Sequence, residues 1–120
     1  MMPSRSFRNN NPGNLRASAW VRGLPGFVGV DDAGFAVFSD WVFGLSAMMR
    51  LLRGATYRGR SIRDALHRYA PKSENDTARY IVFVCRRSGL DPEQIIGALT
   101  PDQFMALVAA MVIMEGWKAE

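Results

Sequence analysis

The hydrophobic and polar positions divide the chain into two regions of different character. Residues 1–38 are rich in Asn, Gly, Pro and aromatic residues and show no helical period, whereas residues 40–116 read as a succession of helical segments. Short apolar runs in the first region predict three strands, around residues 15–20, 26–30 and 35–38. The sequence Asp-Asp-Ala-Gly at 31–34 predicts the turn of a β-hairpin between the last two.

Start and stop signals punctuate the second region. A Ser, Thr or Asp that can cap a helix precedes each segment, and Gly or Pro follows most of them. The predicted helices are residues 40–53, 61–69, 73–89, 91–96 and 100–116. The third is expected to begin at Ser73, with Asp76 in the third helical position. About five helices and one small N-terminal hairpin predict an α+β domain that is predominantly α-helical.

Composition and charge narrow the class of protein. The chain has 120 residues, 48% of them hydrophobic, which is enough for one core. We therefore expect residues 1–120 to form a single domain, with residues 1–7 as a flexible N-terminus. The net charge of +4 favours a polyanionic partner, which is nucleic acid, an anionic membrane face or a bacterial wall that carries carboxylates and phosphates.

Cysteine, histidine and hydropathy limit the chemistry further. Cys85 and His67 are each the sole residue of their type, so we expect no internal disulfide, no metal centre and no cofactor. Residues 1–11 are polar and lack the apolar run of a signal peptide. The longest apolar stretch, residues 104–114, is shorter than the about 20 residues that span a bilayer. No signal peptide and no transmembrane segment are expected.

Glu115 is the acid whose position invites a chemical role. Residues 104–114 are apolar on every side of a helix, which predicts a buried central helix, and Glu115 follows directly. A carboxylate there faces the negative end of the helix dipole, and burial beside Met114 and Trp117 also disfavours its charge, so its pKa is expected to rise. A carboxyl that stays protonated suits the general acid of a glycosidase. The alternative is a solvated glutamate near the end of the chain.

Several motifs resemble those of phage and prophage virion-associated peptidoglycan hydrolases. The specific ones are Arg-Asn-Asn-Asn-Pro-Gly-Asn-Leu-Arg at 8–16 and Arg-Tyr-Ala-Pro-x-x-Glu-Asn-Asp-Thr-x-x-Tyr at 68–80. Less specific are a Phe-x-x-Phe strand at 35–38, a Gly-Leu-Ser-Ala-Met helix at 44–48 and the Glu-Gly pair at 115–116. The resemblance spans residues 7–116 and implies a lysozyme-like fold.

The resemblance also implies a site assembled from both ends of the chain. In phage lysozymes the Glu-Gly helix precedes the hairpin, so the reverse order here suggests a circular permutation, which adjacent termini would permit. Glu115 would then be the catalytic residue and face the Asn-rich segment across a cleft. The residues expected to bind substrate are Asn10, Asn11, Asn14, Arg16, Tyr69, Glu74, Asn75, Thr77 and Tyr80. For the asparagines, Glu74 and the tyrosines, the alternatives are turn formation, helix capping and core packing.

The predicted function is that of a bacteriolytic enzyme of lysozyme type, either a muramidase or a lytic transglycosylase, which cuts the β-1,4 glycan strand of peptidoglycan. The sequence leaves open whether water or the sugar's own hydroxyl completes the reaction. A second catalytic carboxylate is not assigned, because a hairpin turn accounts for Asp31 and Asp32. The alternative is a non-catalytic virion structural or wall-binding module on the same fold.

The expected partners follow from this function. They are bacterial peptidoglycan and the proteins of a phage virion or a secretion apparatus. Nucleic acid is not expected, because the sequence has no recognisable reading helix and no interleaving of aromatic and basic residues. We expect a monomer that resides in the phage virion or the host cytoplasm and acts on periplasmic peptidoglycan.

Overall fold

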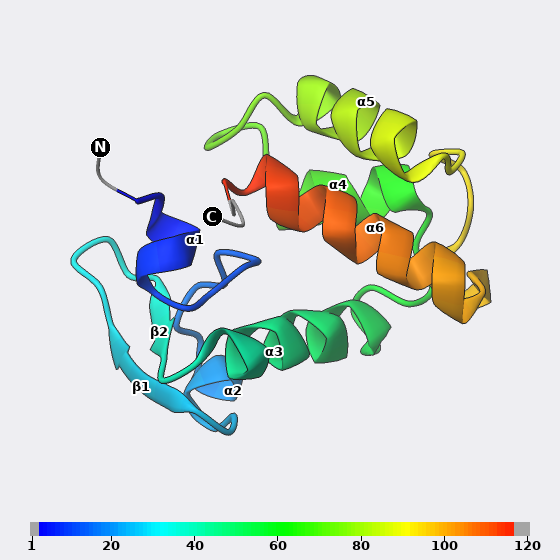
Figure 1. Ribbon diagram of the computed structural model, residues 1–120. Helices are drawn as coiled ribbons and strands as arrows, with labels where there is room; N and C mark the ends of the chain where they lie inside the picture. The colour runs from blue at the N-terminus through cyan, green and yellow to red at the C-terminus, as the bar shows by residue number, and fades with distance from the viewer. Residues whose placement is uncertain (1–2, 117–120) are drawn as a thin grey trace. The chain divides into compact units, whose positions relative to one another are not determined.

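The computed structural model describes residues 3–116 and shows a mixed α+β protein (Figure 1). The helices within this part of the chain are α1 (Arg5–Arg8), α2 (Ala19–Arg22), α3 (Trp41–Arg53), α4 (Ile62–Tyr69), α5 (Thr77–Ser88), the 3₁₀ helix η1 (Ile96–Ala98) and α6 (Pro101–Met114). The strands β1 (Phe27–Val30) and β2 (Ala36–Phe38) form one antiparallel hairpin. The predicted fold class is confirmed. None of the helices in residues 3–116 has the length and apolar character needed to cross a membrane.

The chain folds into two compact units, which we describe separately. Among the described residues, the first contains residues 3–50 together with residues 115–116, and the second contains residues 51–114. Glu115 and Gly116 lie near the end of the sequence, yet they belong to the unit that contains the N-terminal segment.

The first unit is organised around the hairpin. Phe27 pairs with Phe38, their rings meet edge to face at 6.4 Å, and Val30 pairs with Ala36 at the turn end. The strand predicted at residues 15–20 is wrong: a single bridge joins Arg16 to Phe35, and α2 then begins. The chain leaves the sheet because the Ser18 side chain accepts a hydrogen bond from Val21 N and so caps a helix.

An early helix was not predicted in this unit. α1 begins at Arg5, within the segment expected to be a flexible tail, and the Ser4 side chain caps it by accepting a hydrogen bond from Phe7 N. The buried hydrophobic side chains of the unit are Leu15, Val21, Ala36, Phe38, Ala47 and Met48.

The second unit is helical. α5 packs against α6 and also against α4. Thr100 caps α6 as predicted, because its side chain and that of Gln103 exchange hydrogen bonds with each other's backbone N–H. The buried hydrophobic side chains of the unit include Leu52, Ile62, Leu66, Ile81, Val84, Leu107, Val108 and Met111.

Three predicted features of the second unit are wrong. α5 begins at Thr77, because Asp76, and not Ser73, supplies the cap by accepting from Arg79 N. The helix predicted at residues 91–96 is a turn, which Asp91 and Gln94 close by accepting backbone N–H groups with their side chains. α6 is not buried all round: one stripe is exposed, at Met105, Ala109 and Ile113.

Gly44 sets the distance between α3 and the Asn-rich segment. A Cβ atom at Gly44 would overlap the carbonyl oxygen of Asn10 and lie 2.9 Å from Cδ of Pro12. Alanine forms helices better than glycine, so replacing Gly44 with alanine would stabilise the protein if this close approach were absent. The helix backbone thereby supports the segment that carries the predicted site.

Substituting Gly44→Ala should lower the free energy of unfolding by about 2 kcal/mol, since overpacking forces the Asn10 backbone to move. Gly59→Ala is the matched control, because nothing lies within 4 Å of a Cβ at that position. Chemical denaturation of the wild type and both variants measures the difference. Equal stability of the two variants would contradict the close approach.

Candidate functional site

Glu115 is held by the Asn-rich segment. It follows the last residue of α6, is partly buried, and precedes Gly116, which takes the left-handed conformation with φ of 97°. Nδ2 of Asn14 donates to Oε1 of Glu115 at 2.9 Å and to its carbonyl oxygen at 3.0 Å. The two residues are 101 positions apart in the sequence and both belong to the first unit. The expected meeting of Glu115 with the N-terminal segment therefore occurs, through Asn14.

The conformation of Asn14 fits this task. Its φ is 49°, a left-handed value that Asn tolerates better than most residues, and its backbone N–H donates to the carbonyl oxygen of Asn11 at 2.9 Å. Its side-chain Oδ1 is buried and accepts no hydrogen bond from the described residues. A buried acceptor without a donor costs free energy, so this atom is a natural point for a donor from outside the chain.

The neighbouring asparagines hold the segment itself. Asn11 is fully buried, and its side chain donates to the carbonyl oxygens of Leu15 and Ala36 and accepts from Leu15 N. Asn10 has a left-handed φ of 51° and donates to the carbonyl oxygen of Phe38 at 3.1 Å. These contacts tie the segment to β2, so Asn10 and Asn11 position Asn14 from within the protein.

A second contact joins the chain ends at Gly116. A Cβ atom at Gly116 would lie 3.2 Å from Cβ of Ser4, and Oγ of Ser4 lies 3.1 Å from Oγ of the buried Ser6. The start of α1 therefore packs against the Glu-Gly pair. The sequence analysis did not predict this contact, because it joins residues at opposite ends of the sequence.

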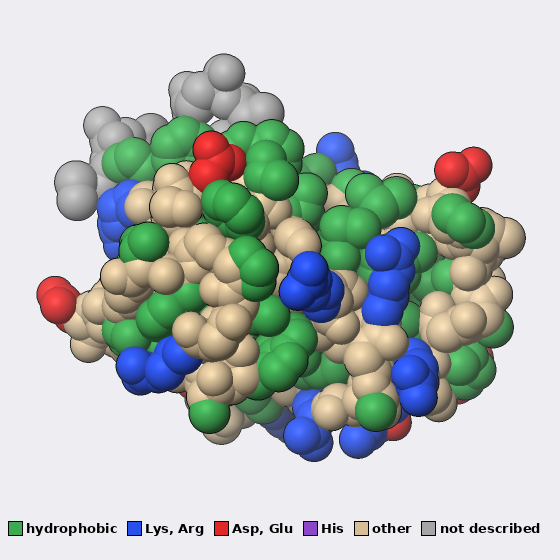
Figure 2. Space-filling view, turned by 90° about the horizontal axis from the view of Figure 1, so that it is seen from below, with side chains coloured by type: hydrophobic (Ala, Val, Ile, Leu, Met, Phe, Trp, Pro, Cys, Tyr) green, Lys and Arg blue, Asp and Glu red, His purple; other side chains and the backbone are tan. Residues whose placement is uncertain are grey.

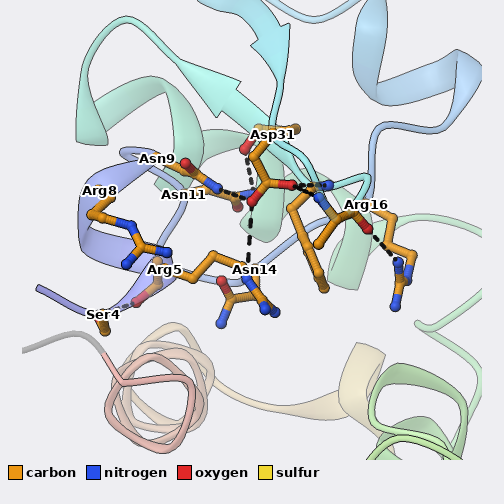
Figure 3. A network of polar contacts seen from close by, with 12 residues as sticks. Ser4, Arg5, Arg8, Asn9, Asn11, Asn14, Arg16 and Asp31 are labelled. Atoms are coloured by element: carbon orange, nitrogen blue, oxygen red, sulfur yellow. Dashed lines mark hydrogen bonds and ion pairs between the residues drawn. The ribbon is translucent and has the colours of Figure 1, made fainter. Parts of the chain in front are cut away.

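Asp31 is the centre of a polar network at the hairpin turn (Figure 3). Its Oδ1 accepts from the backbone N–H groups of Ala33 and Phe35, both at 2.9 Å, and its Oδ2 accepts from Nδ2 of Asn9 at 2.9 Å. Arg5 lies 3.9 Å away. The hydrogen bond from Asn9, followed by that from Phe35 N, holds the pKa of Asp31 below its usual value. Asp31 therefore builds the turn, as its position in the sequence predicted.

Two arginines share the ring of Phe35. Cζ of Arg5 lies 4.2 Å from the ring centroid and Cζ of Arg16 lies 4.5 Å from it. Arg16 also donates to the carbonyl oxygen of Ala33 at 3.3 Å. Arg16 was expected to bind substrate, whereas the role of Arg5 and Phe35 was not foreseen, because nothing local in the sequence links them.

The remaining predicted residues belong to the second unit. Thr77 and Tyr80 are buried, and the Thr77 hydroxyl donates to the carbonyl oxygen of Ala70. The Tyr69 ring meets that of Tyr57 edge to face at 6.1 Å. The exposed residues of the set are Glu74 and Asn75, which lie in the turn before α5. Thr77 and Tyr80 therefore lie in the interior of the second unit, whereas Glu74 and Asn75 are exposed to solvent.

Exposed aromatic residues form a further feature of the first unit. Trp20, Trp41 and Phe43 are between 40% and 47% exposed. Figure 2 shows hydrophobic side chains lying between Lys and Arg side chains on one face of the molecule. A pocket of about 230 Å³ is lined by Leu24, Pro25, Val42, Phe43, Ser46, Ala47 and Arg50. In residues 3–116, no three His, Cys, Asp or Glu side chains lie together as a metal site would require.

The Glu115 carboxyl follows the C-terminal end of α6 and accepts a hydrogen bond from Nδ2 of Asn14. A carboxyl group fixed in place by an amide donor is a candidate for proton transfer to a leaving group.

The chain has a relative among phage proteins. It is 35% identical over 116 residues to protein P5 of Pseudoalteromonas phage PM2, in a match that covers 93% of this chain and 71% of protein P5. No family model matches the chain.

Acid should weaken the hairpin turn through Asp31. A pKa that is lower in the folded state contributes stability above the ordinary value of about 4, and this stability is lost as the pH falls through the folded-state pKa. At pH 7, Asp31→Asn should lower the unfolding free energy by about 1 kcal/mol, because the acceptor for Asn9 is lost. Thermal melts from pH 7 to pH 2 should show the gap between wild type and variant closing below pH 4; a constant gap would exclude this role.

The contact between Asn14 and Glu115 should appear as an energetic coupling. Asn14→Gly keeps access to positive φ while removing the amide, and Glu115→Ala removes the side-chain acceptor while leaving the backbone carbonyl oxygen. A double-mutant cycle on unfolding free energies should give a coupling of about 1 kcal/mol. Additive effects of the two substitutions would show that the hydrogen bond does not stabilise the protein.

Proposed function

The chain belongs to the family of protein P5 of Pseudoalteromonas phage PM2, and we propose that it cleaves the β-1,4 glycosidic bonds of peptidoglycan with Glu115 as the catalytic acid. The observation that carries the proposal is the pair of hydrogen bonds that the Asn14 side chain donates to Glu115. This contact joins the Asn-rich opening to the closing Glu-Gly pair, two of the features that carry the resemblance to virion-associated peptidoglycan hydrolases. A phage relative fits such an enzyme.

Asn14 fixes the Glu115 carboxyl, because its Nδ2 donates a hydrogen bond to Oε1. In the proposed reaction this carboxyl delivers its proton to the glycosidic oxygen. Loss of this proton leaves a carboxylate that the Asn14 amide stabilises. Asn14 acts through Glu115 as a positioning residue, and its buried Oδ1 offers an acceptor to a donor group of the sugar, such as a hydroxyl or an acetamido N–H.

Asp31 does not suit the role of a second carboxylate. A hydrolase uses a carboxylate as nucleophile or base, which needs a free oxygen directed at the substrate. Both oxygens of Asp31 are engaged by Asn9 and by the turn. A single acid is sufficient for a lytic transglycosylase, in which the sugar's own hydroxyl attacks, whereas a muramidase needs a partner outside this network.

A second function, as a virion structural or wall-binding module on the same fold, draws support from the phage relationship alone. In that case the Glu115 site would bind wall without cutting it. The two functions differ in whether the wild-type protein releases fragments from purified wall.

Clearing of a suspension of purified peptidoglycan tests the proposal. Glu115→Gln keeps the acceptor for Asn14 and removes the proton, so the rate should fall about 100-fold or more. Glu93→Gln is the matched control, because Glu93 is exposed and its ion pair within residues 3–116 is the surface pair with Arg63. Unchanged thermal melts confirm that both variants fold.

The contrary results are also defined. Clearing by Glu115→Gln at the wild-type rate would refute Glu115 as the acid. A folded wild-type protein that binds wall and clears none would support the binding module.

A further inference from the structure

The pocket of about 230 Å³ in the first unit lies along one face of α3, and we call it the α3 pocket. Its lining consists of Leu24 and Pro25 from the loop before β1, and Val42, Phe43, Ser46, Ala47 and Arg50 from α3. In residues 3–116, none of these side chains takes part in the contact between Asn14 and Glu115 or in the polar network of Asp31. The α3 pocket is therefore separate from the candidate site described above.

The apolar part of the α3 pocket is held in shape by a glycine and an aromatic ring. Gly26 has a φ of 81°, and a Cβ atom there would overlap the Phe43 ring. The backbone N–H of Ser39 donates to the carbonyl oxygen of Gly26 at 2.8 Å, and that of Phe27 donates to the carbonyl oxygen of Leu24 at 3.3 Å. These contacts fix the loop before β1 against the first turns of α3.

The polar groups of the α3 pocket are Ser46 and Arg50, which are one turn apart on the helix and are both exposed. Arg50 makes no ion pair or hydrogen bond with any residue from 3 to 116, and no Asp or Glu of that range lines the pocket. A guanidinium presents paired N–H donors that match the two oxygens of a carboxylate. The α3 pocket therefore combines an apolar wall with a cation that suits an anionic ligand.

The volume of the α3 pocket limits its occupant. Sites for drug-sized molecules measure about 300–1,000 Å³, so this smaller space suits one side chain and its adjoining polar group. A residue inside a peptide needs two backbone exits from such a space, whereas the last residue needs one. The last residue also carries its side chain and its carboxylate on the same Cα atom. A fatty acid has a carboxylate as well, but its long acyl chain would extend out of the pocket.

We propose that the α3 pocket binds the C-terminal residue of a partner protein. An apolar side chain of the size of Leu lies against Phe43 and Leu24, and the terminal carboxylate pairs with Arg50. The Ser46 hydroxyl is a further donor for that carboxylate. Val42 and Phe43 are 53% and 40% exposed, so a bound peptide removes apolar surface from water. Capture of a C-terminal carboxylate is an established mode of peptide recognition, and it does not depend on catalysis by Glu115.

Fluorescence anisotropy of dye-labelled tetrapeptides tests the proposal. The probe is Gly-Gly-Gly-Leu with the dye on its N-terminus and a free C-terminal carboxylate. It is compared with the same peptide ending in an amide and with Gly-Gly-Gly-Gly ending in a free carboxylate. Each peptide is titrated with the wild-type protein, Arg50→Gln, Ser46→Phe and the control Arg86→Gln, which removes the same charge from α5. All three positions are exposed, and thermal melts check that the variants fold.

The proposal predicts a distinct pattern. The amide peptide and Arg50→Gln should each weaken binding about fivefold, and the two changes should not add, because both remove the same ion pair. The all-glycine peptide should bind about tenfold more weakly, because it lacks the leucine side chain that the pocket buries. Ser46→Phe should weaken binding of the leucine peptide by roughly the same factor, since its ring fills the pocket. Arg86→Gln should bind as the wild type does.

Other results overturn the proposal. Equal binding of the acid and amide peptides, or unchanged binding by Arg50→Gln, would exclude a carboxylate site at Arg50. An equal loss in Arg86→Gln would show attraction by net charge alone, and full binding by Ser46→Phe would place the peptide elsewhere. Displacement of the probe by octanoate at a lower concentration than by unlabelled peptide would reassign the pocket to an acyl chain. No saturable binding of the leucine peptide would also refute the proposal, whatever the clearing assay shows for Glu115.

Discussion

The hydrogen bonds from Asn14 to Glu115 are the constraint on which the candidate site depends. They join residues 101 positions apart and bring the end of the sequence into the unit formed by its beginning. Closing so long a loop costs conformational entropy, although the cost rises slowly with length. The two Asn14 bonds and the packing of Gly116 on Ser4 offset this cost. The site is therefore a product of long-range closure, supported by an Asn-rich segment that is itself fixed to β2.

The closure also gives each polar group near the site a separate task. Asn11 satisfies backbone groups, Asn14 orients the acid, and Asp31 shapes the turn on which Phe35 is presented. Arg5 and Arg16 then place positive charge on that ring. In this division, Glu115 is the residue to which we assign the proposed chemistry, and the surrounding hydrogen bonds hold it in place. Preorganised sites are commonly supported in this way by a shell of fixed partners.

Local signals in the sequence predicted the elements whose causes are local. The hairpin and its Asp31 turn, the cap of α6 at Thr100 and the position of Glu115 after an apolar helix are of this kind. The short helices α1 and α2 have too few residues to show a period, so only their serine caps could have indicated them. Which of three nearby asparagines reaches Glu115, and which arginines meet Phe35, depends on packing between distant segments. The sequence alone does not distinguish one asparagine or one arginine from another in these contacts.

We propose that Glu115, which accepts a hydrogen bond from Asn14, is the acid that cleaves a glycosidic bond. Mass analysis of the fragments that the wild-type protein releases from purified peptidoglycan tests it most directly. The account predicts muropeptides cut within the glycan strand, ending in an intramolecular anhydro sugar if a single acid suffices and in a reducing sugar if water attacks. Release of peptides from intact glycan strands, or no release by folded protein that binds the wall, would contradict it.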